Sequence, residues 1–130
     1  MNHMTRASSD VFLERFGRFH DAILRVVELR FGDVRTAQLV IAAQDATRSR
    51  ADPWVVVRLA LGGVQAFRLD EAQDFRSEVL SHGISVSWFG ECIGLELGDL
   101  LSAPESLEGL AKSRLHFLCS SVSWSVEPYF

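Results

Sequence analysis

Two adjacent residues, His20 and Asp21, are the first in the sequence whose side chains could do chemistry together. An imidazole can act as a general base, and a carboxylate can orient it. These two residues open a predicted strand, however, where neighbouring side chains point to opposite faces, so they cannot pair with each other. One interpretation makes His20 a general base close to His82 or His116. The other makes Asp21 a turn or cap acceptor and leaves His20 half-buried against a backbone carbonyl.

The other reactive side chains are spread along the chain and match no catalytic or metal-binding motif. The sequence contains no G-x-S-x-G, and Ser120 and Ser121 lie within a predicted strand. His116 and Cys119 are three residues apart, which places them on opposite faces of a strand and argues against a metal site. The pair Gly62-Gly63 is followed by no Lys-Ser or Lys-Thr pair, so it predicts a bend rather than a phosphate-binding loop. The sequence therefore predicts no catalytic residue, no metal ligand and no cofactor.

Charged side chains in the middle of the chain suggest binding rather than catalysis. Arg58 and Arg68 stand on either side of the paired glycines and could hold an anion close to His20. An acidic segment, residues 70–78, could present a face to a basic partner, and its alternative is the solvated surface of a helix. The predicted binding residues are His20, Asp21, Arg58, Arg68, Asp74 and Glu78.

The stretch from Trp54 to Leu69 is expected to position these side chains, because it is the longest apolar and β-branched run in the sequence. Its apolar residues occupy both parities, with Val55, Val57, Leu59 and Leu61 on one face and Val56 and Ala60 on the other. A strand that is apolar on both faces is usually central in its sheet, with another layer packed over each face. The run is too short and too charged to cross a bilayer.

Patterns before this stretch predict a helix and then a hairpin. Residues 8–17 combine a polar N-cap with apolar side chains one turn apart, which is typical of a short helix. Residues 19–31 and 37–43 alternate apolar and polar side chains on either side of Gly32-Asp33, and predict an antiparallel hairpin. The residues expected to share the inward side of its first strand are Ile23, Val27, Leu29 and Phe31.

Patterns after the central stretch predict two more helices, a second hairpin and a last strand. Residues 70–80 have the spacing of a surface helix, and residues 84–97 alternate around Phe89-Gly90 as a hairpin does. Ser102 and Glu105 have the spacing of a capping box that opens a helix over 102–111. Its expected inward residues are Leu107, Leu110 and Ala111. The final strand, 115–126, changes parity near Ser120-Ser121, which indicates a bulge.

These elements add up to an α+β protein in a single domain over residues 1–130. The predicted sheet is mostly antiparallel, curved, and has about six or seven strands with two or three short helices. The three tryptophans and nine phenylalanines are expected mainly in the core.

Composition excludes several classes of protein. The chain has 130 residues, 48% of them hydrophobic and 23% charged, which excludes a disordered or collagen-like chain. A formal charge of -4 argues against a protein that binds nucleic acid by neutralising phosphates. Two cysteines do not form a disulfide framework, and no apolar run near the N-terminus resembles a secretory signal. The expectation is therefore a cytoplasmic protein that binds neither nucleic acid nor membrane.

Three short segments together resemble a known kind of protein. They are Phe19-His20-Asp21-Ala22-Ile23, Leu39-Val40-Ile41 and the run from Val55 to Gly63. In this pattern the chain resembles a loose group of small bacterial domains of unknown function, some of which look like immunity proteins encoded beside polymorphic toxins. The resemblance spans Phe19 to Leu69. It implies a cytoplasmic, non-catalytic protein that binds and blocks a partner, and it assigns no residue to that contact.

Two functional hypotheses follow. The first is a non-enzymatic protein-binding module, such as an immunity-like protein, whose acidic surface holds a toxin or another basic protein. The alternative is a small-molecule-binding protein or minor enzyme with a site near His20. A homodimer formed through an edge strand or an apolar sheet face is a further possibility, because the mean hydropathy of +0.12 is high.

Overall fold

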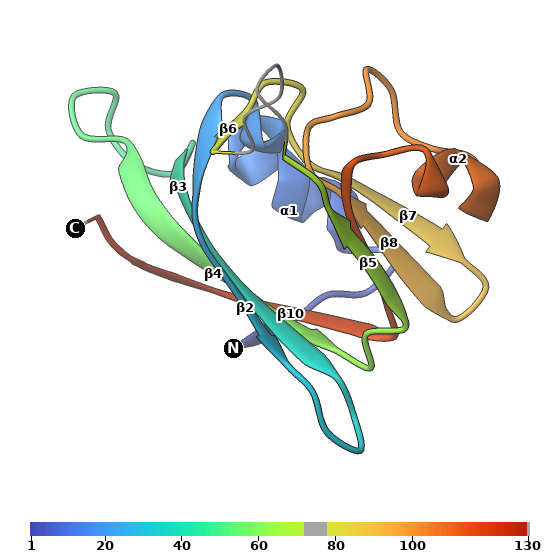
Figure 1. The fold of residues 1–130 in the computed structure, drawn as a ribbon. Helices are drawn as coiled ribbons and strands as arrows, with labels where there is room; N and C mark the ends of the chain where they lie inside the picture. Colours follow the sequence, from blue (N-terminus) through green and yellow to red (C-terminus); the bar gives the residue numbers. More distant parts are fainter. Residues whose placement is uncertain (72–77, 130) are drawn as a thin grey trace.

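The chain folds into two antiparallel sheets that face each other across one core, in a computed structural model that describes residues 1–71 and 78–129 (Figure 1). The larger sheet contains, in spatial order, β1 (Asn2–His3), β10 (Ser121–Pro128), β4 (Trp54–Gly62), β3 (Thr36–Gln44), β2 (Ala22–Arg30) and β6 (Val79–Leu80). The smaller sheet contains β5 (Ala66–Leu69), β9 (Leu115–Cys119), β8 (Cys92–Glu96) and β7 (Ser85–Phe89). The helical segments are α1 (Ser9–Arg15), the single turn η1 (Gly17–Phe19) and α2 (Leu107–Ala111).

The predicted class, mostly antiparallel sheet with a few short helices, is confirmed. The prediction of one sheet with six or seven strands is wrong, because the described residues form a sheet of six strands and another of four. Both predicted hairpins are present, as β2 with β3 and β7 with β8. None of the helices in the described residues is long and apolar enough to cross a membrane.

Two of the passages of the chain between the two sheets lie at one corner. β4 ends at Gly62 and the chain continues into β5 of the other sheet, while β9 passes through Ser120 into β10. The backbone N–H of Ser120 donates to the carbonyl of Gly62 at 3.0 Å, which ties the crossings together. Gly63 has a φ of 59°, and a Cβ there would overlap with Ser120 Oγ. The bend predicted at the glycines is thus confirmed, and the parity change predicted as a bulge is a passage between sheets.

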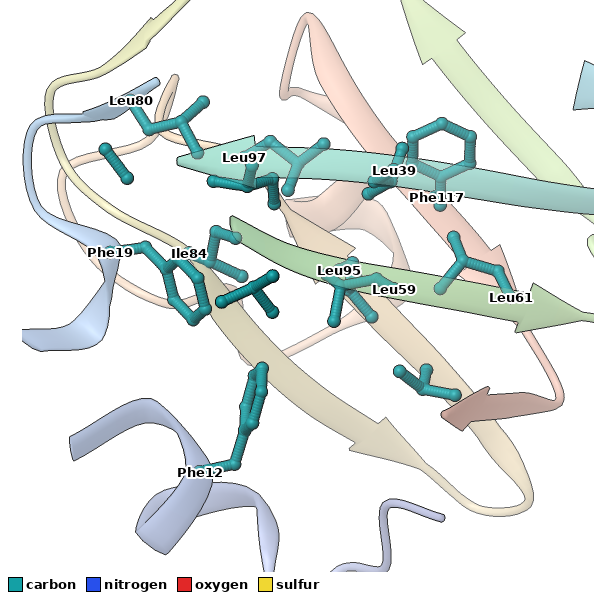
Figure 2. Packing of buried hydrophobic residues seen from close by; sticks show 14 of the residues in the cluster. Phe12, Phe19, Leu39, Leu59, Leu61, Leu80, Ile84, Leu95, Leu97 and Phe117 are labelled. Carbon is teal, nitrogen blue, oxygen red and sulfur yellow. The ribbon is translucent and has the colours of Figure 1, made fainter. Parts of the chain in front are cut away.

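β4 is a central strand, as predicted, with β10 on one side and β3 on the other. Its inward residues are fully buried in the core between the sheets, together with residues from β3, β8, β9 and α1 (Figure 2). Val56 on its other face is also fully buried, as predicted. The layer predicted over that face is not found among the described residues, since none of their helices or strands lies over it (Figure 1).

Aromatic side chains fill the end of the core under α1. Phe12 of α1 and Phe16, the residue that follows this helix, lie 5.4 Å apart between ring centroids, and each contacts Phe19 and Trp124. Trp124 and Trp88 pack against this core, as expected. Trp54 does not, because its parity on β4 places it on the outer face of the larger sheet.

β2 contains one residue more than its ladder with β3 requires. The register pairs Leu24 with Ile41 and Val26 with Val40, so Arg25 has no opposite residue and forms a bulge. Because the bulge resets the alternation, Leu24, Val27 and Leu29 pack on the core. Ile23 and Val26, three residues apart, both face outward. The predicted inward position of Ile23 is therefore wrong.

Two helix predictions need correction. The segment predicted as a helix over 70–80 includes residues 72–77, which lie outside the described residues, and its end, Val79–Leu80, is strand β6. The other predicted helix begins at Leu107 rather than near Ser102. Its N-cap is Ser106, whose side chain accepts from the backbone N–H of Gly109 at 3.0 Å. This later start leaves Leu107 exposed and only Leu110 of the predicted stripe buried.

Candidate functional site

A left-handed backbone turn lies beside the first predicted site residues. Gly17, Arg18 and Phe19 have φ values of 61°, 53° and 60°, and Asp21 follows with 59°. Residues other than glycine avoid this region, at a cost of roughly 1–2 kcal/mol each. Such strain persists only where the surrounding structure enforces it, and it is concentrated at functional sites.

Three contacts hold this turn in place. Phe19 is fully buried among the aromatic side chains of the core. The backbone N–H of Ile84 donates to the carbonyl of Arg18 at 2.9 Å, and the N–H of Asp21 donates to the carbonyl of Leu80 at 2.9 Å. The Cα of Gly83 lies so close to Arg18 that a side chain there would overlap with the Arg18 carbonyl. The turn is therefore fixed by both the core and the chain around β6.

A hollow opens beside the turn, which we call the His20 hollow. Its volume is about 370 Å³. The lining residues are Phe16, Gly17, His20, Asp21, Ala22, Gln44 and Trp54. A second hollow of about 580 Å³, the loop hollow, shares Gly17 and Gln44 with it and extends over the loop between β3 and β4, where Arg48 and Arg50 line it. The two predicted residues His20 and Asp21 thus belong to one concave surface.

The loop beneath this surface is held by Arg15 and Asp45. The two side chains form a two-pronged ion pair at 3.1 and 2.9 Å, and Asp45 is almost completely buried. The hydrogen bond from Arg15, helped by two from Thr47, lowers the pKa of Asp45 to about 2 against the effect of burial. The guanidinium of Arg15 also lies over the rings of Phe16 and Trp124, at 5.0 and 5.6 Å from their centroids. This pair fixes the loop to α1.

The structure does not bring the other predicted binding residues to the His20 hollow. Arg58 lies on the outer face of the larger sheet, paired with Glu127 at 2.6 Å. Arg68 lies on β5 of the smaller sheet, paired with Asp70 at 2.9 Å. Glu78 is exposed just before β6, and Asp74 lies outside the described residues. The expected anion site of Arg58 or Arg68 with His20 is therefore not formed.

The outer face of the larger sheet carries a row of apolar side chains, which we call the apolar strip. Its exposed members are Ile23, Val26 and Val79, and its buried members are Val40, Ala42 and Val56. These residues share one face by strand register, which pairs Val79 with Ile23, Ile23 with Ala42, Ala42 with Val56, and Val26 with Val40. Val26 and Val79 are each 46% exposed. Ile23 and Val26 both face outward because Arg25, the extra residue between them, is set aside in the bulge.

Aromatic and arginine side chains border the strip on the side of the His20 hollow. The rings of Trp54 and Tyr129 lie 6.1 Å apart, and the guanidinium of Arg25 lies 4.8 Å from the centroid of Tyr129. Trp54 also lines the His20 hollow and is the cross-strand partner of Gln44. The strip and the hollow therefore form one continuous surface.

Sequence reasoning missed a buried polar network in the smaller sheet. Glu96 is almost fully buried and accepts hydrogen bonds from the backbone of Asp99 and Leu100 and from Ser113 Oγ at 2.6 Å. Asp99 in turn accepts two bonds from the side chain of Arg114, which lower the pKa of that carboxyl. These residues anchor the 97–114 segment to β8. Their spacing in the sequence, from 96 to 114, follows no motif that could have revealed them.

The histidines and cysteines do not gather at a reactive centre. His116 is buried in the smaller sheet, with Nδ1 2.8 Å from the carbonyl of Ser113, whereas His20 is exposed beside the left-handed turn. Burial raises the pKa of the Cys119 thiol to about 12, which makes it a poor nucleophile. Within residues 1–71 and 78–129, no three histidine, cysteine or acidic side chains are placed to hold a metal ion.

Comparison with known proteins gives no relative. No protein-family model matches the chain, and neither a curated protein nor a solved structure matches it.

Proposed function

We propose that this protein is a non-enzymatic module that binds another protein through the outer face of its larger sheet, in the manner of an immunity protein that blocks a toxin. The observation that supports the proposal most is the apolar strip, in which Ile23, Val26 and Val79 lie side by side and exposed, with no helix or strand of the described chain over them. Adjacent exposed apolar side chains are a feature of interaction sites.

The border of the strip supports the same proposal. Tryptophan, tyrosine and arginine are the residue types that contribute most to protein–protein binding, especially beside apolar surface from which water is removed. Trp54, Tyr129 and Arg25 form such a group at one end of the strip, and Arg58 lies beside Val56 within the face. The Arg58–Glu127 ion pair leaves little net charge in the centre of this surface.

Charge indicates a basic partner. The formal net charge of the chain is -4. Several arginines are paired within the molecule, including Arg18 with Glu14 and Arg48 with Asp52. Exposed acids such as Asp21 and Asp33 form no ion pair within the described residues, so the surface field is negative. A field of this sign accelerates encounter with a positively charged protein.

Binding to the protein encoded by the neighbouring gene tests the proposal. Calorimetric titration of that protein is expected to give a complex with the wild-type chain that weakens as salt is added. Val26→Glu places a charge in the apolar strip and is expected to weaken the complex at least about tenfold, because the carboxylate must lose its water at the interface.

Val34→Glu is the matched control. Val34 lies in the turn between β2 and β3, is 65% exposed, and is not part of the strip. The same chemical change there is expected to leave affinity unchanged. Equal affinities for wild type and Val26→Glu, or equal losses in the two variants, would contradict binding through the strip.

A further inference from the structure

We propose that the His20 hollow receives a guanidinium group, presented by an arginine side chain of the basic partner. The inference rests on the proposed function, because it names the chemistry by which the partner engages the surface next to the apolar strip. Three features of the hollow support it: an unpaired carboxylate, an aromatic wall and an amide acceptor.

The carboxylate belongs to Asp21. It is exposed, it lines the hollow, and it forms no hydrogen bond or ion pair with any described side chain. Of the nearby arginines, Arg18 is paired with Glu14 and Arg48 with Asp52, and Arg50 lines the adjoining loop hollow without an ion pair to Asp21. The backbone of Asp21 is fixed by the hydrogen bond to Leu80 and by the strained turn before it. The charge is therefore held at the hollow without an internal partner.

The aromatic wall and the amide acceptor come from one cross-strand pair, Trp54 and Gln44, at the end of β4 and β3. Guanidinium is planar, carries five N–H donors and stacks on aromatic faces. In this hollow it can lie on Trp54 while its donors reach the Asp21 carboxylate and the Gln44 oxygen. A volume of about 370 Å³ leaves room for a guanidinium and its methylene chain.

The protein already uses this chemistry a short distance away. Arg15 places its guanidinium over the rings of Phe16 and Trp124 and donates to both oxygens of Asp45. Phe16 also lines the His20 hollow. Trp54 and Asp21 form a similar combination of aromatic ring and carboxylate on the surface, where a cation from outside can bind. In the internal combination, the guanidinium of Arg15 already occupies that position.

A side-chain mimic tests the inference without the partner. The chain contains three tryptophans, so the indole N–H signals of ¹⁵N-labelled protein can be resolved and assigned by mutation. Titration with Nα-acetyl-arginine amide is expected to shift the Trp54 signal in a saturable way, with affinity in the millimolar range. Nα-acetyl-lysine amide is expected to bind more weakly, and Nα-acetyl-norleucine amide, which lacks the charge, is expected to leave the signal unmoved.

Asp21→Asn is the decisive variant, because asparagine tolerates the positive φ at this position and removes only the charge. It is expected to weaken binding of the arginine derivative at least fivefold. Asp33→Asn makes the same change of charge in the β2–β3 turn, away from the hollow, and is expected to bind like the wild type. Absence of a saturable shift, an equal shift with the norleucine derivative, or equal affinities for wild type and Asp21→Asn would overturn the inference.

The two proposals can fail separately. If the arginine derivative does not bind while Val26→Glu still weakens the complex, the guanidinium site is wrong and the apolar strip stands. If the derivative binds and Val26→Glu has no effect on any complex, the strip is wrong and the hollow remains a cation site.

Discussion

Asp45 illustrates how one side chain can fix a segment that has no regular structure. Its carboxylate accepts from Arg15, from the backbone N–H of Thr47 and from Thr47 Oγ1, so each oxygen is used. The loop that follows lines the loop hollow, and its position therefore depends on this carboxylate remaining ionised.

Stability is expected to fall in acid because of Asp45. Its pKa in the folded protein is about 2, below the value of about 3.9 in an unfolded chain. Its contribution is therefore complete above about pH 4 and is lost as the pH falls toward 2, by about 2 kcal/mol. Urea unfolding measured across this range checks the expectation. Asp45→Asn removes the titrating group and should show a smaller loss of stability over the same range than the wild type; equal losses would assign the effect to other carboxylates.

The residue types alone do not predict the left-handed turn at residues 17–21. His20 and Asp21 were predicted as site residues from their chemistry, and the structure does place both in one hollow. The positive φ of Arg18 and Phe19 could not be predicted, because neither residue favours that region and the conformation is imposed by burial of Phe19 and by the chain at Gly83. Asp74 lies outside the described residues, so its prediction stays a prediction.

At the scale of elements, the corner where β4 leads into β5 and β9 leads into β10 leaves no room for a side chain at Gly63. Gly63→Ala is expected to destabilise the protein by about 1–2 kcal/mol from the positive φ and by about 1–3 kcal/mol more from overlap with Ser120 Oγ. Comparing the free energy of unfolding of this variant with that of Gly63→Ala/Ser120→Gly separates the two causes. The double variant should recover only the part of the free energy of unfolding that Gly63→Ala loses through overlap with Ser120 Oγ. A Gly63→Ala protein as stable as the wild type would contradict this account of the corner.

Local pattern predicted the elements better than their ends or their partners. Alternation identified β3 and the β7–β8 hairpin, where inward and outward residues follow a period of two, and a long apolar run identified β4. Local pattern failed in β2, where the extra residue Arg25 resets the period, and at Ser106, which caps α2 in place of Ser102. The division into two sheets was also not predicted, because the parity change near Ser120-Ser121 is equally compatible with a bulge and with a passage of the chain between two sheets.

The whole molecule depends on one core shared by both sheets and α1. Residues from β3, β4, β8 and β9 contribute to the same buried cluster, so neither sheet keeps its inner face covered without the other (Figure 2). Unfolding is therefore expected to be a single cooperative transition. Tryptophan fluorescence and far-ultraviolet circular dichroism should report the same urea midpoint, and two separate midpoints would contradict the prediction of a single domain.

The binding surface could be predicted only in part, because it is a product of the assembled sheets. The apolar strip draws residues from β6, β2, β3 and β4, which are scattered from position 23 to position 79 in the chain. The hydrophobic pattern of β4 predicts burial on both faces, and only the arrangement of layers shows which face stays open. Trp54 was expected in the core for the same reason.

The bulge at Arg25 has a genetic consequence. Arg25 has no cross-strand partner on β3. If it were deleted, Leu24, Val26 and Val27 would alternate between the two faces of the sheet, and each would stay on the face that it occupies now. A frame-preserving deletion here would spare the architecture and erase the cation above Tyr129. The residue in the bulge can thus be replaced or lost in evolution with a change in the outer face of β2 and with its inward residues still in register.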